Sequence, residues 1–143
     1  MSKITILGTG SWGCALASVL MSNGHKVLLW GRNPEQVSRI AQKQSVRLAD
    51  FVFEDQPQST MDIAEAMDFS SKILIALPSH AVLEVLKQCA VLIKKPKSFI
   101  CATKGLEPNS LMRISEVVYE TIPVEMVKSY VLLTGPSHAE GVI

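Results

Sequence analysis

Residues 4–17 read ITILGTGSWGCALA. The run at residues 4–7 is apolar or β-branched throughout, which is typical of a strand buried on both faces. Small and apolar residues then follow over residues 11–21 without a proline, until Asn23 and Gly24 supply a helix stop. The stretch therefore predicts a strand, a tight turn built on glycines, and a helix.

The rest of the chain alternates between the same two kinds of segment. Apolar runs predict further strands at residues 27–30, 73–77, 98–102 and 130–133, and a weaker one around 51–53. Helices are expected after an Asn33 N-cap with Gln36 at the capping-box position, near 61–67, after a Ser79 cap, and over 110–121. Strands that alternate with helices predict an α/β fold with a mainly parallel, doubly wound sheet.

The composition suits one globular domain. The chain has 143 residues, of which 48% are hydrophobic and 19% charged, and its net charge is +1. A domain of this length buries roughly two-thirds of its unfolded surface. The near-neutral charge gives no sign of nucleic-acid binding. The N-terminal apolar run is too short for a signal peptide or a membrane span, so we expect no membrane insertion and a soluble, cytoplasmic protein.

The three cysteines, Cys14, Cys89 and Cys101, stand inside apolar runs, without a CxxC spacing or a nearby pair of histidines. We therefore expect buried, reduced thiols, and we predict neither a disulfide nor a metal site.

The glycines of the opening stretch follow the GxGxxG pattern at Gly8, Gly10 and Gly13. The pattern follows a predicted strand, opens a helix and precedes a second strand within about 30 residues, which is the context of a Rossmann dinucleotide site. In that context Gly8 makes the tight turn, Gly10 lets a pyrophosphate approach the backbone, and Gly13 lets the helix pack on the strand. A plain packing turn is the alternative.

The end of the second predicted strand lacks the acidic residue that marks NAD preference. Arg32 stands there, 19 positions after Gly13. A guanidinium at this place can bind a ribose 2′-phosphate or stack on adenine, so NADP is expected to be accepted and NAD stays possible. The alternative is a solvated surface arginine.

Two later turns also lie at carboxyl ends of predicted strands, where ligands bind in such sheets. Lys104 follows the strand at 98–102, and Gly135-Pro136-Ser137 follows the last strand. Taken alone, Lys104 reads as an exposed loop lysine, and Ser137 as the N-cap of a helix. The three histidines, His25, His80 and His138, read as structural or solvated residues.

Taken together, five motifs in this order resemble bacterial NAD(P)-dependent glycerol-3-phosphate dehydrogenase: GTGSWG, LWGRN, LPS at 77–79, TKG at 103–105 and TGPSHAEGV at 134–142. The resemblance implies reversible NAD(P)H-dependent reduction of dihydroxyacetone phosphate to sn-glycerol 3-phosphate, for glycerophospholipid synthesis. It also implies a possible homodimer. The family's roles place Ser11, Trp12, Arg32, Lys104 and Ala139 at the cofactor, and Lys104, Gly135 and Ser137 at the substrate.

The resemblance also implies a part that these residues lack. The general acid/base of the family is a lysine in a second, helical domain. We therefore expect residues 1–143 to be the Rossmann domain alone, with no catalytic residue, weak or partial NAD(P)H binding and no turnover. His138 stands where the family more often has phenylalanine, and Gly141 where glutamate is common.

Two other functions remain open at this point. A free-standing NAD(P)H-sensing module would explain the missing half, although it would not need Lys104 or the GPS turn. The first domain of another hydroxy-acid dehydrogenase would share the same glycine turn.

Overall fold

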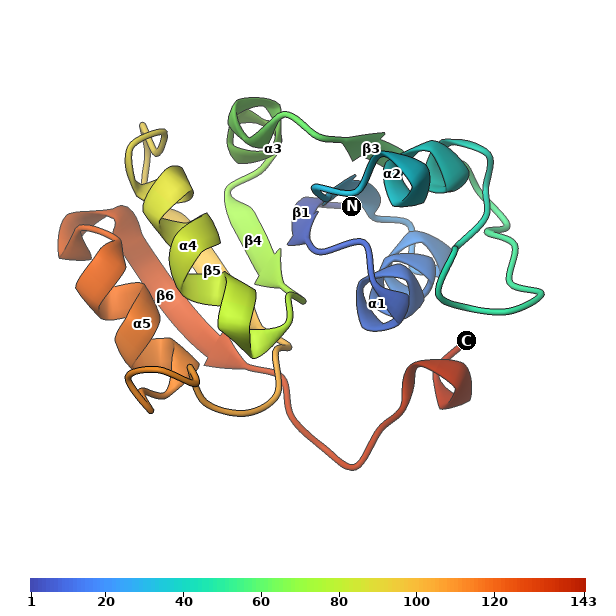
Figure 1. Ribbon diagram of the computed structural model, residues 1–143. Helices are drawn as coiled ribbons and strands as arrows, with labels where there is room; N and C mark the ends of the chain where they lie inside the picture. Colours follow the sequence, from blue (N-terminus) through green and yellow to red (C-terminus); the bar gives the residue numbers. More distant parts are fainter.

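The computed structural model describes residues 1–143, which form a sheet flanked by helices (Figure 1). The strands are β1 (Lys3–Leu7), β2 (Lys26–Trp30), β3 (Gln58–Thr60), β4 (Lys72–Ile75), β5 (Lys97–Cys101) and β6 (Val127–Leu132). The helices are α1 (Ser11–Ser22), α2 (Pro34–Ala41), α3 (Ile63–Phe69), α4 (Ser79–Ala90) and α5 (Ile114–Thr121), with short 3-10 turns η1 (Val124–Met126) and η2 (Ala139–Gly141).

The six strands run in the order β3-β2-β1-β4-β5-β6, and every neighbouring pair is parallel. This is the strand order of the Rossmann fold, in which the direction of winding reverses between β1 and β4. The predicted fold class is therefore confirmed. Ligands of such sheets bind outside the carboxyl ends of the strands at the reversal point.

Alternate residues of the strands enter two separate cores. Ile4 and Ile6 of β1 pack in a cluster of 15 buried residues with α1 and with Ile40 of α2. Leu7 faces the other way, into a cluster of 19 buried residues shared with α3, α4 and α5. Because both faces of the central strands are covered, their sequences are mostly apolar, and the hydroxyl of buried Thr5 in β1 donates to the carbonyl oxygen of Ala66.

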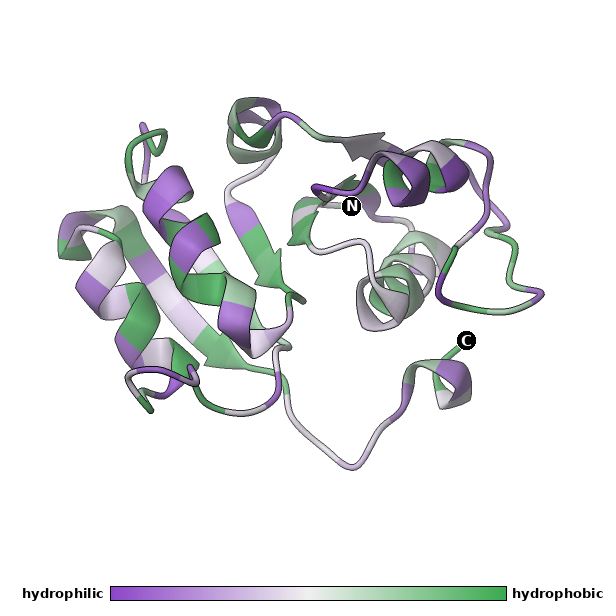
Figure 2. Cartoon of the chain, viewed as in Figure 1, coloured by the Kyte–Doolittle hydropathy of each residue, from purple (hydrophilic) through white to green (hydrophobic).

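The colouring by hydropathy follows this layering. Figure 2 shows mostly hydrophobic colour along β4 below its first residue, and mixed hydrophobic and hydrophilic colour on α4 and α5. Buried residues of α4 include Val82, Val85, Leu86 and Cys89, at helical spacing. No helix of the structure is both long and apolar enough to cross a bilayer.

The weak strand expected around residues 51–53 is wrong. The third strand is Gln58–Thr60, and the earlier segment makes only one isolated antiparallel bridge, between Gln44 and Val52. Phe53 is buried and contacts Phe51 edge to face, so these aromatic side chains pack on the core from a loop. The true strand lies at the sheet edge and is polar, and it therefore gives no apolar run.

Two helix starts also differ from expectation. Helix α5 begins at Ile114 rather than near residue 110, because Leu111 has a left-handed φ of 57° that a helix cannot contain. The side chain of Ser79 is no cap, since Pro78 holds the N-cap position of α4 and makes no side-chain bond. The expected Asn33 cap is confirmed, as its side chain accepts bonds from the amides of Glu35 and Gln36.

Candidate cofactor site

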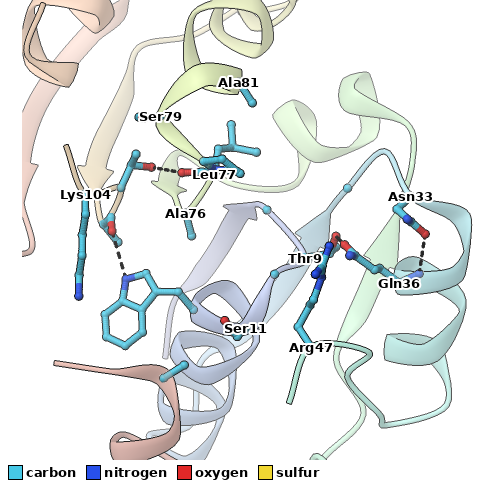
Figure 3. A pocket seen from close by; sticks show the side chains of 18 of the residues that line it. Thr9, Ser11, Asn33, Gln36, Arg47, Ala76, Leu77, Ser79, Ala81 and Lys104 are labelled. Carbon is cyan, nitrogen blue, oxygen red and sulfur yellow. Dashed lines mark hydrogen bonds between the residues drawn. The ribbon is translucent and has the colours of Figure 1, made fainter. Parts of the chain in front are cut away.

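A cleft of about 820 Å³ opens at the carboxyl ends of the central strands, at the reversal point of the sheet (Figure 3). Its walls come from the glycine turn after β1, the ends of β2, β4 and β5, and the segment before η2. A cleft of this size fits a small-molecule cofactor.

The three glycines of the turn serve different purposes. Gly8 has a φ of 128°, and a Cβ there would collide with the backbone oxygen of Ala76, directly after the neighbouring strand β4. A Cβ at Gly13 would collide with the backbone oxygen of Gly8, so this glycine lets α1 pack against the turn. A Cβ at Gly10 would meet no atom within 4 Å. The space above Gly10 is therefore left open toward the cleft.

Helix α1 presents its N-terminus to this open space. Gly10 is its N-cap, no side chain caps the helix, and its first turn holds no acidic residue. The first amide groups of a helix have no partner within the helix, and the helix dipole places positive charge there. The turn is thus built to receive an anionic group from the cleft.

Trp12 and Lys104 connect the glycine turn with the loop after β5. The indole Nε1 of Trp12 donates to the carbonyl oxygen of Ala102 at 3.1 Å. The Nζ atom of Lys104 lies 5.6 Å from the centre of the Trp12 ring, within the range of a cation–π contact. The indole therefore forms part of the cleft wall, with one face toward an ammonium group.

The same ammonium reaches the segment after β6. Lys104 Nζ donates to the carbonyl oxygen of Ser137 at 2.6 Å. An ammonium has three donors, so two remain for groups inside the cleft. Ala139 follows and is buried against α1, which anchors the segment to the core.

A buried carboxylate organises the loop that carries Lys104. Glu107 is 1% exposed, and its Oε2 accepts bonds from the amide and the hydroxyl of Ser110, both at 2.6 Å. Its Oε1 accepts from the Asn109 side chain at 3.2 Å. These hydrogen bonds, those of Ser110 above all, lower the pKa of Glu107. The carboxylate thus stays ionised and holds the loop in shape.

The opposite end of the cleft is lined by polar groups from β2, α2 and the loop that follows. Thr9 Oγ1 donates to Gln36 Oε1 at 2.7 Å, so Gln36 bonds to the turn rather than closing the capping box expected of it. A Cβ at Gly31 would collide with the side chain of Thr9, so a glycine is needed for this contact. Arg32 lies beside them and pairs with Glu84 of α4, with 3.0 Å between Nη1 and Oε2.

Residues 3–143 match the family described as NAD-dependent glycerol-3-phosphate dehydrogenase N-terminus. The chain belongs to this family. It is 41% identical to glycerol-3-phosphate dehydrogenase [NAD(P)+] of Lysinibacillus sphaericus over 145 residues, covering all of this chain and 43% of that protein. The crystal structure of glycerol-3-phosphate dehydrogenase from Coxiella burnetii superposes with a TM-score of 0.85 at 32% identity, over 99% of this chain and 43% of that one.

The chain therefore spans less than half the length of these relatives. GDP-mannose dehydrogenase from Pseudomonas aeruginosa also superposes, with a TM-score of 0.73 over 97% of this chain and 37% of that one. At 14% identity this likeness concerns the fold alone. The resemblance expected from the sequence is confirmed, because the chain belongs to the glycerol-3-phosphate dehydrogenase N-terminus family.

The cleft brings together most of the residues expected from the sequence. Those that line it are Gly8, Gly10, Ser11, Trp12, Arg32, Lys104, Ser137 and Ala139. Gly13 lies beneath the turn, and Gly135 lies outside the lining of the cleft. Eight of the ten expected positions thus line one cleft.

The cleft also contains residues that the sequence did not point to: Thr9, Gln36, Arg47 and Thr103. Thr9 lies within the GTGSWG motif and Thr103 within the TKG motif, so their neighbours in the sequence already indicated that they could line the site. Arg47 lies in a segment without periodicity, and nothing local in the sequence connects it to the glycine turn. His80 and His138 line the cleft as well, whereas His25 accepts a bond from the Ser2 amide far from it.

Proposed function

We propose that the cleft binds NAD(H) and NADP(H), with the pyrophosphate over Gly10 at the N-terminus of α1. The observation that carries this proposal is the contrast among the glycines. The protein's own backbone occupies the space where a Cβ would lie at Gly8 and Gly13. The corresponding space at Gly10 is open to the cleft. A pyrophosphate needs such close approach to the backbone, together with the amides and dipole of a helix terminus.

The residues around this position would each contact a different part of the cofactor. Ser11 and Trp12 would contact it at the first turn of α1, and Arg32 would contact its adenosine end. Ala139 would face the nicotinamide, on the side of the cleft where Lys104 and Ser137 meet. Lys104, Gly135 and Ser137 would line the place of the substrate.

The reaction proposed for the complete enzyme is the reversible reduction of dihydroxyacetone phosphate to sn-glycerol 3-phosphate. When bound, NAD(P)H supplies the hydride that is added to the carbonyl carbon of the substrate. Lys104 keeps two ammonium donors free for an anionic or carbonyl oxygen, and its bond to Ser137 fixes its direction. We place the general acid/base, a lysine, outside residues 1–143, and we therefore take these residues to be the cofactor-binding domain.

The test is a fluorescence titration of the 143-residue chain with NADH and NADPH. Both should bind, and Trp12→Ala should weaken both, because the indole forms part of the cleft wall. Failure of either cofactor to bind at millimolar concentration would contradict the proposal. Reduction of dihydroxyacetone phosphate by this chain alone would contradict the placement of the acid/base in another part of the enzyme.

A cytoplasmic location and a homodimeric enzyme also belong to the proposal. All three cysteines are free and buried, which suits a reducing compartment. Cell fractionation and light scattering of the complete enzyme would check these two points.

A further inference from the structure

The adenosine end of the cleft holds two arginines in different situations. Arg32 at the end of β2 pairs with Glu84 on α4, with 3.0 Å between the two charged groups. Arg47, in the loop between α2 and β3, forms no ion pair and makes no side-chain hydrogen bond, although it lines the same cleft. Only the second guanidinium has all its donors available.

The pairing with Glu84 limits what Arg32 can do. A phosphate that binds Arg32 must displace the Glu84 carboxylate or lie close to it, and like charges at such a distance repel each other. The pair is half-exposed, so the attraction within it is weak, but the carboxylate stays on α4 whether or not the pair is broken. Arg32 is therefore a poor sole receptor for a dianion.

The backbone around Arg47 is fixed, so this arginine is directed into the cleft. Its amide donates to Ser45 Oγ at 3.2 Å, and the next residue, Leu48, is 3% exposed in the core beside α1. Figure 3 shows the Arg47 side chain running from the loop toward Thr9 and Gln36. The loop therefore brings a free guanidinium to the end of β1 and β2.

Gln36 supplies a neutral donor at the same place. Its Oε1 accepts from Thr9, so its amide nitrogen is turned away from Thr9 with both N–H groups free. The only acidic side chain that lines the cleft is Glu140, which belongs to the segment after β6. The lining of the cleft thus offers no carboxylate at the Arg47 end that could bind a ribose diol.

We propose that Arg47, assisted by Gln36, is the residue that recognises the 2′-phosphate of NADP(H), while Glu84 restrains Arg32 from this role. The inference rests on the proposed function, because it needs the adenosine ribose at this end of the cleft. A phosphate monoester carries close to two negative charges near neutral pH, and a guanidinium can meet two of its oxygens at once. Arg47 thereby sets the preference between the two cofactors.

The test measures dissociation constants for NADH and NADPH with the chain and with Arg47→Met. Loss of a charge-assisted bond to phosphate should weaken NADPH binding roughly tenfold or more and leave NADH within about twofold. Arg39→Met is the matched control, since Arg39 is also exposed and bonds to Gln44 outside the cleft. It should change neither constant.

Two further variants distinguish the arginines. Arg47→Lys keeps the charge without the planar fork and should lose part of the NADPH preference. Glu84→Gln should strengthen NADPH binding by about threefold, and this gain should disappear when Arg32 is also replaced by Met. The NADPH preference should fall with added salt, and less steeply in Arg47→Met.

The outcomes separate this inference from the proposed function. Equal losses for both cofactors in Arg47→Met, or an NADPH-specific loss found only in Arg32→Met, would overturn the role of Arg47 while both cofactors still bind the wild-type chain. Failure of the wild-type chain to bind either cofactor would overturn the proposed function itself. Circular dichroism of Arg47→Met should match the wild type, because the side chain is exposed.

Discussion

The glycine turn after β1 and the Lys104 loop after β5 lie at the same edge of the sheet, yet different contacts hold them. Backbone packing defines the turn, because added atoms at Gly8 or Gly13 would strike main-chain oxygens. Side-chain hydrogen bonds define the loop, through Glu107 and the bond from Lys104 to Ser137. Close backbone packing therefore holds the glycine turn in place, whereas the Lys104 loop depends on a few polar side-chain contacts.

This difference suits what each half is proposed to bind. A pyrophosphate is common to both cofactors, so its site can be rigid and independent of side chains. The Lys104 side is the part of the cleft that we propose to receive the reacting groups. Polar side-chain contacts can be exchanged for others at small cost, whereas backbone packing cannot.

The largest effect should come from Gly8→Ala. The new Cβ would meet the carbonyl oxygen of Ala76, which directly follows β4, and would sit at a φ of 128°, which side chains rarely adopt. We expect a loss of about 3 kcal/mol or more in the free energy of unfolding. Urea denaturation measures it, and a loss below about 1 kcal/mol would show that β1 and β4 can move apart.

Gly10→Ala sharpens the same comparison within the turn. Gly10 has a φ of −73°, and its Cβ would meet nothing, so the free energy of unfolding should change by less than about 1 kcal/mol. The methyl group would occupy the space proposed for the pyrophosphate, and NADH should bind at least roughly tenfold more weakly. Unchanged NADH affinity in a folded variant would place the pyrophosphate elsewhere.

The turn is also the part of the molecule that the sequence predicts best. Gly8, Gly10 and Gly13 act through local backbone geometry, and the flanking strand and helix have strong apolar patterns. The parallel direction of the strands follows from the alternation of strands and helices, since parallel strands need crossover connections. These features are set by short-range rules, so one sequence is enough to read them.

The wrong predictions and the missed site residues concern positions whose surroundings are formed by segments distant in the sequence. The strand at Gln58–Thr60 pairs only with β2, and its polar residues carry no sign of that pairing. Arg47 reaches the cleft only because Leu48 is anchored in the core beside α1. Gln36 has the right spacing from Asn33 for a capping box, but its side-chain oxygen accepts a hydrogen bond from the hydroxyl of Thr9 instead. Such contacts are decided by tertiary packing and have no local signature.

A smaller effect is expected where the Lys104 loop leaves the sheet. The hydroxyl of buried Thr103 donates to the carbonyl oxygens of Leu77 at 2.8 Å and of Ile75 at 3.3 Å. Thr103→Val keeps the shape and leaves these carbonyls without that donor, at a cost of about 1–2 kcal/mol in the free energy of unfolding. Thr103→Ser keeps the hydroxyl and should lose clearly less, so equal losses would show that the methyl group matters more.

The smallest effect should lie within the loop itself and should depend on pH. Because hydrogen bonds from Ser110 and Asn109 lower the pKa of Glu107 in the folded chain, its carboxylate stabilises the fold above its ordinary pKa of 4.5. That contribution is lost as the pH falls through the lowered pKa, whereas Glu107→Gln has no proton to gain.

The urea midpoints of the two proteins should therefore differ most at pH 7 and converge toward pH 3. A deficit in Glu107→Gln that is equal at both pH values would mean that shape, and not charge, makes this residue hold the loop. Since the loop carries Lys104, NADH affinity measured at pH 7 in the same variant shows how far this support reaches into the cleft. The glycine turn contains no titratable side chain, so Gly10→Ala should show no such convergence, which separates the two halves by the forces that maintain them.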